Sequence, residues 1–148
     1  MRIVAALMLL ASLGACATST SITETADEIR ITQGLGGLVP NTARAYNAMI
    51  AKNKRMVIDG QVISADAFYA FATPGVCYTK NAIFSPHSAS YLGVIPARKV
   101  TEQLSGILPP PLRDWFRNHH SYYDPIGFPA VDYDQLKDIW PEGACEEA

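Results

Sequence analysis

The chain has 148 residues, of which 12 are Lys or Arg and 14 are Asp or Glu, so its formal net charge at pH 7 is -2. Its hydrophobic fraction of 49% is enough to build a core, and its length favours one domain over two. Because the basic residues form no cluster, nucleic acid is excluded as an expected partner.

Residues 1–15 have the order of a secretion signal. Arg2 is followed by the apolar stretch from Ile3 to Leu13, which is well short of the roughly 20 residues that cross a bilayer as a helix. The end of the stretch, Leu13-Gly14-Ala15-Cys16, resembles the bacterial lipobox, and the alternative is an ordinary signal peptide cut elsewhere. The resemblance implies a mature chain that starts at a lipid-modified Cys16 and is held by this lipid on the periplasmic face of a bacterial membrane. Ala17, in place of Asp, then indicates the outer membrane by resemblance to envelope sorting rules.

The three cysteines fit the same oxidising compartment. If Cys16 carries lipid, Cys77 and Cys145 remain as an even pair. We expect them to form a disulfide, and the alternative is two free buried thiols.

Residues 16–27 are mostly small and hydroxylated, which predicts a flexible tether in front of a single domain at 28–148. The alternation around Ile29 and Ile31 predicts a first strand that ends in a glycine-rich loop. A helix is expected after Asn41, which is a good cap. A second strand is expected from Arg55 to Ile58, followed by a turn at Gly60 and Gln61.

The second half of the chain continues this alternation. A short helix is expected over 65–72, two short extended pieces within 76–84, a helix over 97–108, another that opens at Pro111, and a tail helix over 132–139. Alternating strands and helices predict an α/β domain with a mainly parallel sheet and flanking helices.

Ser64 stands where the second strand gives way to the short helix. Backbone N–H groups at a helix start are unpaired and stabilise a nearby negative charge, which an acyl-transfer site requires. The alternative is a serine that only caps the helix.

Four segments in this order resemble the Clp-type peptidase branch of the crotonase superfold. They are Gly36-Gly37 after the first strand, Tyr46 in the following helix, the stretch GQVISADAF at 60–68, and the stretch NAIFSPH at 81–87. The resemblance runs from about Glu28 to His87. It implies a small, trimmed core of that fold.

The resemblance also implies roles for individual residues. Ser64 would be the nucleophile and His87 the general base, with the N–H groups of Gly37 and Ala65 as the oxyanion hole. The third catalytic residue is expected to be Asp124. The substrate would be a peptide or an ester, and no cofactor is expected, because an envelope protein would not meet the acyl-CoA used by other members of the superfold.

Other readings of the acidic and histidine residues remain open. Asp132 and Asp134 are rivals for Asp124 as the third catalytic residue. His87 taken alone is more often a polar residue at a strand end. The adjacent pair His119-His120 does not predict a metal site, because neighbouring side chains point to different sides of a regular element and no second ligand pair is suitably spaced.

A second function is therefore considered besides that of a hydrolase. Asp66 places a charge next to the nucleophile position, and Pro86 removes an N–H donor just before His87. These features favour a catalytically inactive envelope lipoprotein that keeps the fold as a binding or structural module.

Overall fold

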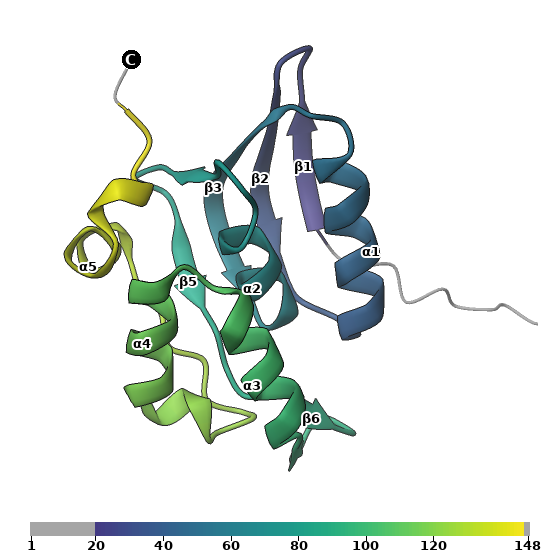
Figure 1. The fold of residues 1–148 in the computed structure, drawn as a ribbon, viewed down its shortest axis with the longest axis vertical. Helices are drawn as coiled ribbons and strands as arrows, with labels where there is room; N and C mark the ends of the chain where they lie inside the picture. The colour runs from purple at the N-terminus through teal and green to yellow at the C-terminus, as the bar shows by residue number, and fades with distance from the viewer. Residues whose placement is uncertain (1–19, 147–148) are drawn as a thin grey trace, which may run out of the picture.

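The computed structural model of the protein describes residues 20–146, so the signal sequence and Cys16 lie outside the described residues. Within this range the chain is a mixed α/β domain with five α-helices and a partly parallel sheet (Figure 1). None of its described helices is long and apolar enough to span a bilayer.

The sheet is built around β3, and its pairing is partly parallel, whereas the alternation of elements predicted a mainly parallel sheet. β2 pairs with β3 in parallel, and β4 and β5 pair in parallel with β3 one after the other. β1 is antiparallel to β2 at the edge of the sheet. The strands are β1 (Thr20–Glu24), β2 (Glu28–Gly34), β3 (Arg55–Ile63), β4 (Cys77–Tyr78) and β5 (Ile83–Ser85).

The predicted tether is wrong for the residues from Thr20 onward. Thr20–Glu24 forms β1, with Thr20 opposite Gly34 at the end of β2. Lys52 and Lys54 hold Glu24 at the other end of β1, at 2.6 and 2.7 Å. The small hydroxylated residues that suggested a tether thus pair as an edge strand, whose mostly exposed side chains need not be apolar.

The predicted turn at Gly60 and Gln61 is also wrong. β3 runs on to Ile63, and the pairing with β2 shifts its register between Ile31 and Gln33. A Cβ atom at Gly60 would overlap the carbonyl of Thr32, so glycine is required by the close approach of the two strands. This glycine therefore marks a bulge inside the strand.

The helices are α1 (Val39–Ile50), α2 (Ala65–Phe71), α3 (Arg98–Ile107), α4 (Pro110–Asn118) and α5 (Tyr133–Ile139). Proline stands in the first turn of α1 and of α4, where a backbone N–H would have no partner within the helix. α1 begins two residues before Asn41, so Asn41 is not its cap. Asp132 caps α5 through the backbone N–H of Gln135.

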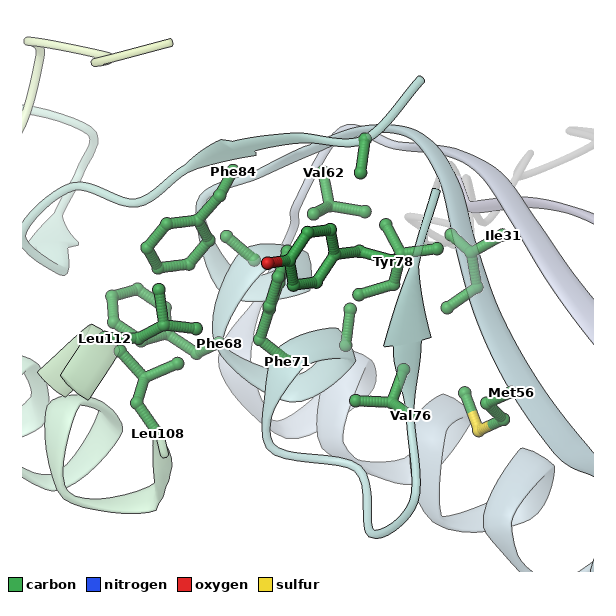
Figure 2. Packing of buried hydrophobic residues seen from close by; sticks show 14 of the residues in the cluster. Ile31, Met56, Val62, Phe68, Phe71, Val76, Tyr78, Phe84, Leu108 and Leu112 are labelled. Carbon is green, nitrogen blue, oxygen red and sulfur yellow. The ribbon is translucent and has the colours of Figure 1, made fainter. Parts of the chain in front are cut away.

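The hydrophobic core gathers where α2 meets the sheet and α4. Phe71, Tyr78 and Phe84 lie together in Figure 2, with 4.8 Å between the ring centres of Phe71 and Phe84. Phe68 meets Phe116 of α4 edge to face at 5.2 Å. Every residue of α2 except Tyr69 is buried, so the helix behind Ser64 is held on all sides.

The expected disulfide is present. Cys77 at the start of β4 is bonded to Cys145, with 4.8 Å between their Cα atoms. The C-terminal segment also runs beside β4, since the Cys145 N–H donates to the Tyr78 carbonyl at 2.9 Å. The bond therefore fixes the end of the described chain to the sheet.

A small hairpin outside the main sheet was not predicted. β6 (Ser90–Tyr91) and β7 (Ile95–Pro96) pair antiparallel just before α3. Figure 1 shows the label β6 beside the lower end of α3, away from the sheet.

Candidate active site

Ser64 occupies a sharp corner between β3 and α2. Its backbone angles are φ 57° and ψ -130°, a conformation that residues other than glycine rarely adopt. Its hydroxyl makes no capping hydrogen bond to α2, although Ser64 holds the cap position. The Ser64 side chain is half-buried and lines a cavity. The Ser64 hydroxyl therefore does not cap α2. The simpler interpretation of this serine, as a helix cap only, is wrong.

The backbone around Ser64 is held on two sides. The Ser64 N–H donates to the Ser85 carbonyl at 3.1 Å, which extends the β3–β5 pairing by one residue. The buried helix α2 follows directly. Since Ile63 lies opposite Ser85, the corner is set beside the residues that lead to His87.

His87 follows β5 and lines the same cavity as Ser64. Neighbouring strands lie about 4.8 Å apart, so the parallel register brings the two residues close together in the fold. The two side chains make no hydrogen bond to each other in this structure. His87 is 8% exposed, packs edge to face on Phe128 at 4.5 Å, and has no hydrogen-bond partner for Nδ1 among the described residues.

Burial lowers the pKa of His87, and the backbone near Ser88 and Pro125 and the Asp124 charge only partly oppose this effect. Desolvation disfavours the charged imidazolium. The ring is therefore neutral at pH 7, which is the state that a general base requires.

The cavity that Ser64 and His87 share has a volume of about 250 Å³. Its walls come from the glycine loop, α2, the hairpin and α3, and none of its lining residues carries a formal charge at neutral pH. The apolar side chains larger than alanine are Leu38, Val39, Phe68, Val100 and Leu104, and Tyr91 belongs to the hairpin.

The glycine loop packs directly on Ser64. Gly36 has φ 80°, and a Cβ atom there would lie 2.6 Å from the Ser64 Cβ. Gly37 has φ 150° and lines the cavity, as does Ala65. The N–H groups of Gly37 and Ala65 donate no hydrogen bond to another described residue. The two expected oxyanion donors thus border the same space as the hydroxyl.

Asp66 holds the glycine loop in place. Its fully buried carboxylate accepts the Gly36 N–H at 2.7 Å and the Thr20 hydroxyl at 3.0 Å. The pKa of Tyr46 is raised, mainly by burial and secondly by the charge of Asp66. The Tyr46 hydroxyl therefore stays protonated. Asp66 does not line the cavity. The Asp66 carboxylate thus binds the glycine loop and the edge strand β1.

Asp124 does not reach His87 by a hydrogen bond. Its carboxylate accepts the Ile126 N–H at 2.9 Å and shapes the turn at Gly127, where a Cβ atom would overlap it. Those backbone contacts lower the pKa of Asp124, and the Ile126 N–H has the largest effect. His87 lowers this pKa only by a smaller electrostatic effect. The rivals do not take its place, because Asp132 caps α5 and Asp134 lies in the first turn of the same helix.

The two adjacent histidines belong to a cluster of aromatic rings. His119 lies on Trp115 at 4.6 Å, and its Nδ1 contacts the Ser121 hydroxyl at 2.9 Å. No group of three or more His, Cys, Asp or Glu side chains suited to a metal ion is found between residues 20 and 146.

Several residues of the site have no signal in the sequence. Phe128 meets His87 across 41 positions of chain, and Val100 and Leu104 were expected only as the apolar face of a helix. Long-range packing alone brings them to the cavity. Leu92-Gly93 between apolar residues was the one local sign of a hairpin.

Comparison of the chain with known protein families, with curated proteins and with solved structures found no match.

Proposed function

We propose that the protein is a serine hydrolase that uses Ser64 as nucleophile and His87 as general base. The observation that carries the proposal is the strained backbone of Ser64, which presents an uncapped hydroxyl to a cavity that a buried neutral histidine also lines. Strain of this kind costs on the order of 1–3 kcal/mol and persists where the surrounding structure enforces it. Asp66, Gly36 and the buried α2 supply that enforcement.

In the reaction, the Ser64 Oγ attacks a carbonyl carbon while His87 accepts the hydroxyl proton. The carbonyl oxygen becomes an oxyanion that the N–H groups of Gly37 and Ala65 stabilise. The bond to the leaving group then breaks, and His87 returns the proton to the leaving amine or alcohol. Water, activated by His87, hydrolyses the acyl-enzyme and restores Ser64.

The substrate follows from the cavity walls. No formal charge faces the cavity at neutral pH, and Phe68, Val100 and Leu104 are among its lining residues. Apolar walls favour an uncharged acyl group. We therefore propose a peptide or an ester with an apolar acyl group, of the size of one large side chain or a short acyl chain.

The finer fold and the location belong to the same proposal. The parallel β2–α1–β3–α2–β5 succession, with a glycine loop against the serine corner, supports a trimmed Clp/crotonase-like core. The lipobox and the disulfide support an envelope lipoprotein held by lipid on Cys16, on the periplasmic face of the outer membrane.

A fluorophosphonate probe tests the nucleophile on the chain from Ala17 onward, which keeps every described element. We expect labelling of the parent protein and its loss in Ser64→Ala. Ser90→Ala is the matched control, because Ser90 lines the same cavity but stands on the hairpin, and it should label normally. No labelling of a folded parent protein, or equal labelling of Ser64→Ala, contradicts the proposal.

One observation favours an inactive binding module as the second candidate. The Nδ1 of His87 has no hydrogen bond, and Asp124 is engaged with its own turn, so no acid orients the imidazole. On this reading the apolar cavity binds a ligand without cleaving it. Binding of an acyl ligand to both the parent and Ser64→Ala proteins, with no probe labelling of either, identifies this case.

A further inference from the structure

The exposed large hydrophobic side chains are unevenly distributed. Twelve are found among the described residues, and nine of them lie on the three segments that surround the candidate site. These segments are the glycine loop, the β6–β7 hairpin and the loop that carries Phe128. The nine side chains are Leu35, Leu38, Tyr91, Leu92, Val94, Ile95, Tyr123, Ile126 and Phe128.

The hairpin tip is the most apolar part of this surface. Leu92 is 91% exposed, and Val94 and Ile95 are 61% and 53% exposed. The Val94 N–H donates to the Tyr91 carbonyl at 3.3 Å and closes a turn in which Leu92 and Gly93 have φ 53° and 80°. Asn is the favoured residue at such a turn, and leucine is strained there. The turn thus carries a large apolar side chain where local conformation favours a small polar one.

Two basic residues follow the base of the hairpin. Arg98 and Lys99 follow β7 at the start of α3, and both are exposed. Neither forms an ion pair with another residue of the described range. Exposed apolar and aromatic side chains with adjacent unpaired cations are the combination that binds an anionic lipid surface.

The first described residue, Thr20, lies toward the same end of the molecule. Thr20 lies opposite Gly34, and its hydroxyl contacts Asp66, two residues after Ser64. Figure 1 shows the start of β1 toward the end of the sheet on which the hairpin lies. Three residues separate Thr20 from Cys16, and the four steps of chain between them span at most about 14 Å. A lipid on Cys16 would therefore hold this end of the domain close to the bilayer.

We propose that the hairpin tip and the Arg98-Lys99 pair dock on the surface of an anionic phospholipid bilayer, so that the mouth of the Ser64 cavity faces the membrane. Tyr91 links the two features, because it belongs to the exposed hairpin and also lines the cavity. Docking then brings the site to acyl groups at the membrane interface. The docking itself does not require catalysis.

Vesicle co-sedimentation tests the proposal with the chain from Ala17 onward, which lacks the lipid and so isolates the hairpin. We expect binding to vesicles of phosphatidylglycerol and phosphatidylethanolamine, weaker binding to phosphatidylcholine, and weakening as salt is raised. Leu92→Asn removes the apolar side chain and suits the positive φ, so it should fold at least as stably and bind at least tenfold more weakly. Lys99→Gln should weaken binding to the anionic vesicles about fivefold.

Ile107→Asn is the matched control, because Ile107 is 43% exposed at the far end of α3 and does not line the Ser64 cavity. It should bind like the parent protein. Equal binding of Leu92→Asn, or no preference for anionic vesicles, overturns the proposal. A concentration-dependent dimer that Leu92→Asn abolishes, without vesicle binding by the parent, overturns it in favour of a second copy as partner.

Discussion

Asp66 Oδ2 accepts the backbone N–H of Gly36 at 2.7 Å, which joins the start of α2 to the glycine loop across 30 positions of sequence. In the sequence this acid looked like a charge that would oppose an oxyanion. In the structure it is fully buried, lies outside the cavity wall and keeps Gly36 against Ser64. A residue that argued against catalysis thus becomes part of the support for the serine corner.

Replacement of Asp66 by Ala should destabilise the protein by about 2–3 kcal/mol, because it leaves the buried Gly36 N–H without an acceptor. Thr20→Val removes only the second, part-buried contact and should cost about 1 kcal/mol. Urea unfolding of both variants measures the difference. Equal stability of Asp66→Ala and the parent protein would show that this contact does not hold the loop.

The strain at Ser64 predicts an unusual stability order. Ser64→Gly relieves the positive φ, whereas Ser64→Ala keeps it. We expect the glycine variant to be about 1 kcal/mol more stable than the alanine variant, with both unable to react with the probe. Thermal or denaturant unfolding checks the order. The reverse order would mean that the corner is not strained.

Gly36→Ala should destabilise the protein by about 2 kcal/mol or more and reduce the reactivity of Ser64. The added Cβ would lie 2.6 Å from the Ser64 Cβ at a backbone φ of 80°. Gly75→Ala is the matched control, since Gly75 also has a positive φ of 71° but no heavy atom within 4 Å of the added Cβ. The control should lose only about 1 kcal/mol and keep full reactivity.

The lowered pKa of His87 predicts the pH dependence of the hydrolase. Activity requires the neutral ring, so kcat/KM should rise with pH, reach half its maximum below 6.5 and stay level to pH 8. Because the folded pKa lies below the unfolded value, the same group contributes stability above pH 6.5 that is lost as the pH falls through the folded pKa. A midpoint above 6.5 would contradict a buried, desolvated base.

Opening the disulfide should destabilise the domain by about 4 kcal/mol on the chain-entropy estimate, since Cys77 and Cys145 are 68 positions apart. Cys145→Ser, compared with the parent protein in denaturant with and without a reductant, measures the effect. A reductant should destabilise the parent protein and leave the variant unchanged. An equal loss of stability in the parent protein and in Cys145→Ser on adding the reductant would show that the effect does not come from this disulfide.

Local patterns in the sequence were sufficient for the order of β2 to β5 and the five helices, although not for β1 or the β6–β7 hairpin, because hydrophobic periodicity and proline or glycine positions act within a few residues. The alternation around Ile29 and Ile31 predicted β2, and compartment chemistry predicted the Cys77–Cys145 bond. Local patterns failed where pairing across the sheet decided the outcome. Edge pairing turned Thr20–Glu24 into a strand, and contact with Thr32 made Gly60 a bulge.

The sequence by itself determined which residue types stand at the corner: a serine after a strand, a glycine loop before it and a histidine 23 positions later. Only the tertiary structure decided what surrounds them. Parallel pairing of β5 with β3 sets His87 beside the Ser64 cavity, burial makes its ring neutral, and the turn at Gly127 engages Asp124. Burial and contacts between distant segments depend on how the whole chain packs, and no short window of sequence contains that information.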